Sequence, residues 1–268
     1  MKSEEVKEFA LVIVQSLAKD DLPTGDLLFE GIIKYKKFKE ESLSAEIHHV
    51  SGKVALFEFL EALNLRIKND QLFPILHLET HGYEDGIQLA SGERVPWLEL
   101  LPYFRKINVT LGNQLIIVLA VCVGISLIGA VWPDDRAPFN AMIGATRDVS
   151  QIDIRNGFES FYDTYFFTFD ILASLESINA AIGQEKPLFY VLTANHIFDA
   201  FVDPDRDPKH FAQMVTQHAV EEKSANPRYQ KIPFPIVRLI AERRIKRILK
   251  DAADRKDYFM MTDLKGDG

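Results

Sequence analysis

Cysteine is almost missing from this sequence, since Cys122 is the only one among 268 residues. A single cysteine permits no disulfide within the chain, which is typical of proteins in a reducing cytoplasm. It also excludes a zinc site built from several cysteines. We therefore expect a cytoplasmic protein, and we expect neither a metal ion nor a cofactor.

Long apolar runs are also absent. A helix that crosses a membrane needs about 18 or more consecutive apolar residues. The longest apolar run, 115–131, is interrupted by Cys122, Gly124 and Gly129. Residues 1–8 are too acidic for a secretory signal. From these observations we expect neither a membrane span nor a signal peptide.

Positive charge is scarce relative to negative charge. The chain has 31 Lys and Arg residues against 39 Asp and Glu residues, a formal net charge of −8. Such a surface repels the phosphate backbone, so we expect no direct binding of nucleic acid. No glycine-rich phosphate loop of the form GxGxxG or GxxxxGK[ST] is present, which argues against nucleotide binding. We interpret the basic stretch 243–250 as a solvated helix face, with an acidic partner or nucleic acid as the alternatives.

Two short apolar runs carry the most information. Residues 73–80 lead into His81 and Gly82, and residues 114–121 lead into Cys122. Both runs are rich in branched residues and are bounded by glycine, which is typical of buried strands in a mostly parallel sheet.

The segment between these runs determines how their ends lie. Its apolar spacing predicts a helix over 95–108, preceded by a glycine-containing loop or hairpin over 83–94. A strand–helix–strand crossover makes the two strands parallel, so their carboxyl ends fall on the same edge of the sheet. The pattern therefore brings His81 and Cys122 close together, although they are 41 positions apart.

The remaining pattern predicts the architecture. Further strands are predicted over 9–14, 45–50, 139–145 and 188–193, and further helices over 26–38, 54–63, 154–169, 170–182 and 236–254. Strands and helices alternate up to about residue 194, and only helices follow. We therefore predict an α/β domain, 1–194, with a helical C-terminal extension, 195–268.

A histidine beside a thiol supports a specific chemistry. Cysteine is a strong nucleophile only as the thiolate, and a neighbouring histidine takes up its proton and later returns it to the leaving group. Gly82 lets the chain approach a substrate closely. The N–H groups of Gly82 and Cys122 are candidates for an oxyanion hole. The pair therefore points to hydrolysis of a peptide bond through a thioester, with His81 as base and Cys122 as nucleophile.

Each of these residues has a plainer interpretation when it is taken alone. A cysteine at a strand end is commonly a small buried hydrophobe, and many turns contain His-Gly. His77 lies four positions before His81 on the same face of the strand, so we interpret it as a core residue or a support for His81. Glu79 shares that face, and orienting His81, lining the cleft and capping are all open roles for it.

Taken together, these segments resemble the caspase-fold cysteine peptidases, and within them the CHAT branch, the bacterial relatives of caspases and separase. The residues that carry the resemblance are 76–82, 85–87, 95–97, 119–124 and 144–146, with Phe161 and Tyr162 in the next helix. It covers about residues 70–170, follows the first strands and helices in outline, and leaves the helical extension unmatched.

The resemblance implies a caspase-like three-layer α/β/α sandwich with a mostly parallel sheet. It implies a cysteine endopeptidase with His81 as general base, Cys122 as nucleophile and an oxyanion hole from the Gly82 and Cys122 amides. The expected substrate is a protein or peptide. CHAT proteins often work beside sensor modules in bacterial signalling or antiviral defence, so the resemblance also implies activation by a separate regulatory or sensor protein.

In this fold, substrate preference is set largely by two loops, and both are acidic here. Glu84 and Asp85 follow His81, and Asp148 and Asp153 follow the strand after the Cys122 strand. Together with Glu79 they form the candidate substrate pocket. Such a pocket favours a basic residue before the scissile bond, although aspartates in loops are often turn formers.

Two other classes of function stay open. The first is a catalytically inactive caspase-like scaffold that binds a partner through the same cleft, which a separated His81 and Cys122 would favour. The second is a Rossmann-like ligand-binding or regulatory module in which Cys122 is merely buried.

Overall fold

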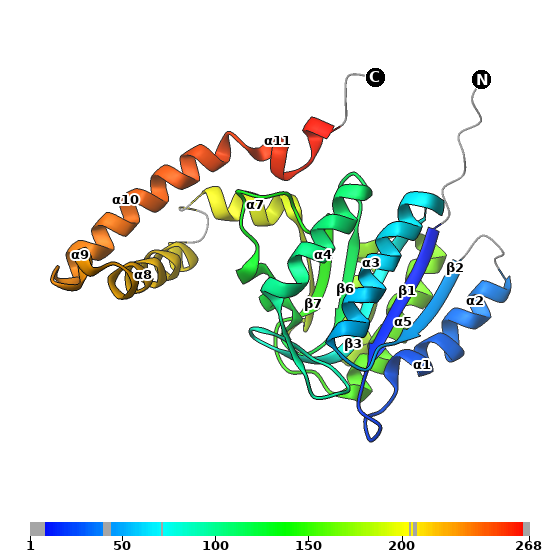
Figure 1. The fold of residues 1–268 in the computed structure, drawn as a ribbon. Coiled ribbons are helices and arrows are strands. Elements are labelled where there is room, and N and C mark those ends of the chain that lie inside the picture. The colour runs from blue at the N-terminus through cyan, green and yellow to red at the C-terminus, as the bar shows by residue number, and fades with distance from the viewer. Residues whose placement is uncertain (1–8, 40–43, 71, 204, 206–207, 265–268) are drawn as a thin grey trace, which may run out of the picture. The chain divides into compact units, whose positions relative to one another are not determined.

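The computed structural model describes residues 9–39, 44–70, 72–203, 205 and 208–264. Contacts divide the chain into two compact units, one formed by Met1–Val131 and Ala137–Ala194 and the other by Trp132–Arg136 and Asn195–Gly268. The described strands all lie in the first unit, and the second unit contains helices (Figure 1). The short segment Trp132–Arg136, which falls inside the predicted first domain, groups with the second unit.

The described strands of the first unit form one mixed sheet. Their order is β2-β1-β3-β6-β7-β8, and β4 and β5 form a ribbon that continues from β3. Neighbouring strands are parallel from β2 to β7, and β8 runs antiparallel to β7. The strands are β1 (Phe9–Ser16), β2 (Ser44–His49), β3 (Phe73–Tyr83), β4 (Gly86–Gln88), β5 (Arg94–Pro96), β6 (Ile116–Ala120), β7 (Ala141–Ala145) and β8 (Phe189–Thr193).

Helices cover both faces of the sheet, so the first unit is a three-layer α/β/α sandwich. In Figure 1, α3 and α4 lie over one face, and α1, η1, α5 and α6 share a core cluster with the other face. The elements are α1 (Thr24–Leu28), the π-helical turn η1 (Phe29–Ile33), α2 (Lys34–Lys39), α3 (Lys53–Asp70), α4 (Trp97–Thr110), the 3₁₀ helix η2 (Gly124–Ala130), α5 (Gln151–Thr168) and α6 (Ile171–Ile182).

Coverage on both faces explains why the central strands are apolar along their length. Leu11 and Ile13 belong to the core cluster under α1 and α5, and Ala10, Val12 and Val14 point to the opposite layer because strand residues alternate. All five side chains are buried. Each of the valine, leucine and isoleucine side chains contributes about 1.5–3 kcal/mol when it is removed from water. The strand ends that carry the site are therefore anchored from both sides.

The sheet reverses its order between β1 and β3, and ligand sites tend to form at such a point. From β1 the chain crosses one face towards β2, and from β3 it crosses the other face towards β6. The loops that follow β1 and β3 therefore diverge and leave a crevice at the carboxyl ends of the strands. The order differs from the 3-2-1-4-5-6 order of Rossmann sheets.

The helix that joins β3 to β6 starts later than predicted. Val95 and Pro96 belong to β5, and α4 begins at Trp97. A residue before proline is held out of the helical region, so Val95 stays extended. The prediction of a helix over 95–108 was therefore wrong at its first two residues.

The direction of β8 follows from the connection before it. Two helices lie between β7 and β8: α5 ends at Thr168 and is followed by Phe169, which has a φ of 52°, and α6 is capped by Asp170. One helix returns the chain to the amino edge of the sheet, and the second brings it back to the carboxyl edge. The following strand must then run antiparallel, a direction that the predicted strand 188–193 did not specify.

The second unit has a small core of its own between α8 and α10. The buried residues of this core are Phe201, Val215, Ala219, Val237, Ala241, Ile245 and Leu249. Arg136 holds Asp263 through two hydrogen bonds of 2.8 Å each. The elements are α7 (Ala194–Val202), α8 (Pro208–Ala225), α9 (Pro227–Gln230), α10 (Phe234–Ala253), α11 (Lys256–Phe259) and η3 (Thr262–Leu264). None of the helices described in either unit combines the length and apolarity that a bilayer crossing requires.

Candidate active site

His81 lies in β3, beyond the part of that strand that pairs with β6, and Cys122 stands two residues after the end of β6. The register of β3 and β6 pairs Glu79 with Ala120, and two residues further along each strand stand His81 and Cys122. Residues paired in a parallel sheet point to the same face, so both side chains belong to the face covered by α1 and α5. The sequence prediction that one crossover places them at the same sheet edge agrees with this register.

Gly82 lies against the backbone of Cys122. A β-carbon at position 82 would stand 2.1 Å from the carbonyl oxygen of Cys122 and 2.9 Å from its nitrogen. No side chain fits in this space, because the obstructing atoms belong to the backbone and cannot rotate away. Glycine at this position is what allows the segment after His81 to approach Cys122.

The turn after Cys122 is strained and tightly packed. Val123 adopts a left-handed conformation, with φ of 47° and ψ of 28°, which is a true outlier for a β-branched residue. Such a conformation costs about 1–3 kcal/mol and persists only when the surroundings impose it. Here the N–H of Val123 donates to the carbonyl of Arg147, at 3.2 Å. Gly144 also allows close approach, since a β-carbon there would lie 3.0 Å from the backbone of Gly124.

The thiol of Cys122 is in contact with the backbone of Val149. It accepts a hydrogen bond from the Val149 N–H at 3.4 Å and donates to the Val149 carbonyl at 3.6 Å. Within the described residues, no hydrogen bond joins Cys122 to His81. The structure therefore brings the two residues to one edge but leaves the thiol on the loop before α5.

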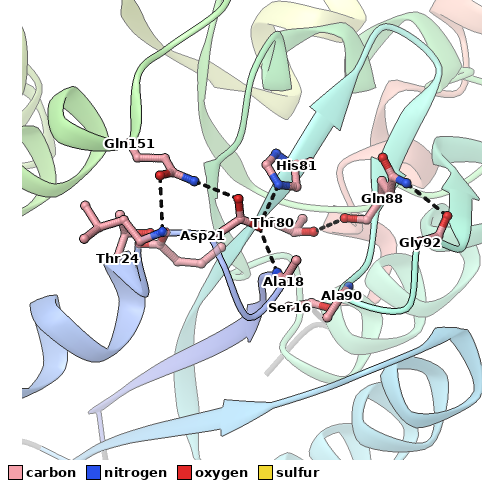
Figure 2. A network of polar contacts seen from close by, with 12 residues as sticks. Ser16, Ala18, Asp21, Thr24, Thr80, His81, Gln88, Ala90, Gly92 and Gln151 are labelled. Carbon is pink, nitrogen blue, oxygen red and sulfur yellow. Dashed lines mark hydrogen bonds and ion pairs between the residues drawn. The ribbon is translucent and has the colours of Figure 1, made fainter.

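The imidazole of His81 is held by a residue that the sequence did not single out. Its Nε2 lies 2.9 Å from the carboxylate of Asp21, in the loop after β1. Figure 2 shows Asp21 between His81 and Gln151. The His81 side chain is 45% exposed and that of Asp21 only 19%, so the ring faces solvent while its anchor is mostly covered.

Asp21 is fixed in turn by its own neighbours. Gln151 donates to its second oxygen at 3.1 Å, and the backbone N–H of Ala18 donates at 2.8 Å. Burial alone raises the pKa of Asp21, but the hydrogen bonds from His81 and Ala18 and the charge of His81 outweigh it and hold the pKa below 3.8. The carboxylate is therefore ionised across the physiological range.

The hairpin after His81 is attached to the same edge. The hydroxyl of Thr80 donates to the carbonyl of Gln88, and the N–H of Ala90 donates to the hydroxyl of Ser16 at 2.9 Å (Figure 2). Trp97 closes the base of the hairpin through a 3.0 Å hydrogen bond to Ser126. These contacts link the hairpin to the end of β1 and to the segment that follows Cys122.

The position of Glu79 corrects the sequence prediction that it lines a substrate pocket. Glu79 is 1% exposed. One of its oxygens lies 3.0 Å from Nε2 of His77, and the other accepts a hydrogen bond from the hydroxyl of Thr24. The side chain points to the predicted face, but α1 covers that face at this depth. Glu79 contacts neither His81 nor the solvent-facing edge.

The other predicted pocket residues lie nearer the surface. Glu84 and Asp85 form the exposed turn between β3 and β4, and Asp148 is exposed in the loop before α5. Asp153 lies in the first turn of α5, where its N–H is capped by Ser150 at 3.0 Å. In the described part of the chain, no group of three or more His, Cys, Asp or Glu side chains could hold a metal ion.

Asp21 and Val149 are the residues that the sequence prediction missed. Loops have no periodicity, so nothing within 17–23 distinguishes Asp21 from its neighbour Asp20. The topology contains the usable signal, because β1 lies beside β3, and the loop after a strand at a switch point lies beside the crevice.

Comparison with known proteins identifies the fold. No protein-family model matches this chain, and no curated protein matches it either. Among solved structures, the crystal structure of the Drosophila initiator caspase Dronc is similar, with a TM-score of 0.51 and 12% sequence identity over 70% of this chain and 80% of that chain. The first unit is thus a caspase-like α/β/α sandwich.

Proposed function

We propose that this chain is a cysteine peptidase in which Cys122 is the nucleophile and His81 the general base. The observation that carries the proposal is the sheet edge where Asp21 holds His81 while Gly82 lies against the Cys122 backbone. The caspase-like fold supports it, because the similar Drosophila structure is that of an initiator caspase.

The contact with Asp21 determines which nitrogen of His81 does the chemistry. Nε2 donates its hydrogen to the carboxylate, which leaves the lone pair on Nδ1. In the proposed mechanism Nδ1 takes the proton of Cys122, and the thiolate attacks the carbonyl carbon of a peptide bond. The amides of Gly82 and Cys122 donate to the oxyanion.

The second half of the reaction returns the enzyme to its starting state. Nδ1 of His81 gives its proton to the leaving amine, the C–N bond breaks and a thioester on Cys122 forms. Water then attacks the thioester with His81 again as base. The acid product leaves, and the thiol of Cys122 is restored.

The acidic loops support a substrate preference for a basic residue before the scissile bond. Asp148→Lys is expected to lower the ratio of cleavage rates between peptides with Arg and Ala at that position by about tenfold, since it replaces attraction by repulsion. Paired fluorogenic peptides measure the ratio. Glu58→Lys, which makes the same charge change on the exposed side of α3, is the control and should leave it unchanged. A wild-type preference for acidic or small residues would contradict the charge argument.

We also propose that the chain belongs to the CHAT branch and acts in the cytoplasm in bacterial signalling or antiviral defence, switched on by a separate sensor protein. The position of the thiol supports the proposal that the enzyme needs activation, since the Cys122 thiol is hydrogen-bonded to the backbone of Val149 rather than to His81. In this proposal the free protein visits a state in which the loop before α5 releases the thiol towards Nδ1, and thiol labelling reports this state. The partner makes it the main state.

The coupling of His81 to Cys122 is tested by thiol labelling. His81→Ala is expected to slow labelling of Cys122 by iodoacetamide at neutral pH about tenfold, because the thiolate loses its proton acceptor. The rate is measured from pH 5 to pH 9 on the folded protein, which has no other cysteine. His49→Ala is the matched control, since His49 also lies 2.9 Å from a carboxylate, that of Asp26. Cys122 in this variant should label at the wild-type rate.

The separated thiol favours a second candidate function, a catalytically inactive scaffold that binds a protein partner at the same edge. The two functions differ in the labelling result. The scaffold would be favoured if Cys122 labels slowly in both the wild type and His81→Ala and the wild-type protein cleaves nothing in a peptide screen. Fast labelling that depends on His81 would favour the peptidase.

A further inference from the structure

A line of polar residues runs along β3 from the core to the edge. His77, Glu79 and His81 occupy every second position and therefore share one face of the strand. His77 is 0% exposed and Glu79 is 1% exposed, so both lie where apolar side chains would be expected. The proposed reaction uses only His81, and burial of the other two polar groups requires compensating hydrogen bonds.

These hydrogen bonds connect α5 to the start of α1. The hydroxyl of Tyr162 lies 2.8 Å from Nδ1 of His77, and Nε2 of His77 lies 3.0 Å from Glu79. The hydroxyl of Thr24 then donates to the second oxygen of Glu79. Burial and the neighbouring charge of Glu79 raise the pKa of Tyr162 well above its ordinary value, so its hydroxyl stays protonated.

Thr24 links this network to the candidate active site. It is the first residue of α1 and stands three positions after Asp21. The next residue, Gly25, is seated on the strands, since a β-carbon there would lie 2.8 Å from Gln15 and 3.3 Å from the Glu79 side chain. The loop that carries Asp21 therefore ends at a point fixed to β1 and β3.

We propose that Glu79 and Thr24 are positioning residues: they fix the end of the Asp21 loop, and through it the orientation of His81. This inference rests on the proposed function only for the role of His81. The network has a far part, Tyr162 and His77, and a near part, Glu79 and Thr24. Only the near part touches the loop that holds His81.

This division gives a matched pair of variants. Thr24→Val removes the hydroxyl that Glu79 accepts from, and Tyr162→Phe removes the hydroxyl at the other end of the same buried network. Thr24→Val is expected to slow labelling of Cys122 about tenfold at neutral pH, because a misplaced Asp21 no longer orients His81. Cys122 in Tyr162→Phe is expected to label at the wild-type rate. Thr24→Ser keeps a hydroxyl at position 24, so it is expected to label at the wild-type rate as well. Thermal melts of the same proteins measure the loss of stability.

A purely structural network gives a different result. If Thr24→Val and Tyr162→Phe both slow labelling in proportion to their loss of stability, the inference is overturned. It is also overturned if Thr24→Val labels like the wild type while His81→Ala labels slowly, and the proposed function then survives alone. If His81→Ala itself labels at the wild-type rate, the proposed function fails together with this inference.

A second variant covers the case in which Thr24→Val does not fold. Glu79→Gln keeps the shape of the side chain but has one acceptor oxygen in place of two. It therefore replaces one acceptor by a donor and alters the hydrogen bond to Thr24 or to His77, and slow labelling of Cys122 in a folded Glu79→Gln protein supports the positioning role. Wild-type labelling over the whole pH range would overturn it.

Discussion

Gly82→Ala is expected to destabilise the first unit by about 3 kcal/mol, an overpacking cost, and to abolish fast labelling of Cys122. The added β-carbon would stand 2.1 Å from the carbonyl oxygen of Cys122 and 2.9 Å from the β-carbon of Val121. Neither atom can rotate out of the way, so the two strand ends must separate. The free energy of unfolding from a urea titration and the labelling rate measure the two effects.

Gly129→Ala is the matched control for this substitution. Gly129 lies in η2, on the segment after Cys122, and a β-carbon there would meet nothing within 4 Å. Its replacement should leave labelling unchanged and stability unchanged or slightly increased, since alanine has less freedom in the unfolded chain. If Gly82→Ala has the same free energy of unfolding and the same labelling rate as Gly129→Ala, the close approach of Gly82 to Cys122 does not exist in solution.

Asp21→Asn is expected to lower the proposed peptidase activity, and the His81-dependent labelling of Cys122, by about tenfold to a hundredfold at neutral pH. The asparagine oxygen can still accept a hydrogen bond from Nε2, but the charge that stabilises the protonated ring is gone. An asparagine can also present its NH₂ group and favour the other tautomer of His81. The cleavage and labelling rates of the wild type and of Asp21→Asn are measured under the same conditions at pH 7.

The same variant has a defined effect on the pH dependence of stability. The pKa of Asp21 is lowered in the folded protein, so its contribution is present above its ordinary pKa of 3.8 and disappears as the pH falls through the folded value. The difference in free energy of unfolding between wild type and Asp21→Asn, about 2 kcal/mol for one hydrogen bond to a charged group, should therefore be present at neutral pH and shrink below about pH 4.

Asp20→Asn separates this effect from a general change of charge. Asp20 is adjacent to Asp21 and exposed, and the substitution Asp20→Asn removes the same charge from the same loop. It should keep the wild-type rate and the wild-type dependence of stability on pH. Equal losses in Asp20→Asn and Asp21→Asn would show that the loop acts through its net charge and that the contact between Asp21 and His81 has no special role.

The parts of the site that were predictable are those tied to strand periodicity. The runs 73–80 and 114–121 are mostly apolar because both faces of the sheet are covered, and this pattern fixes where β3 and β6 reach the edge. The polar exceptions are His77, Glu79, Thr80 and Gln114. The crossover rule then makes the strands parallel. His81 and Cys122 could be placed at one edge from these two facts alone, without knowledge of any side-chain contact.

The parts that were not predictable depend on how distant segments pack. Alternation gives the face of Glu79, but it does not reveal that α1 begins at Thr24 and covers that side chain. The partner of His81 comes from a loop 60 positions earlier, and only the order of the strands brings them together. The position of the Cys122 thiol depends on a backbone contact with Val149, for which the side-chain pattern carries no signal.

The dispersed origin of the site has a consequence for how the protein matures. Asp21 meets His81 across 60 positions and Gln151 across 130 positions, and contacts between such distant segments form slowly. A chain that is still being synthesised contains Cys122 before it contains Gln151, so Cys122 is made before its surroundings are complete. The order of synthesis thus delays the assembled candidate site until the sheet has closed.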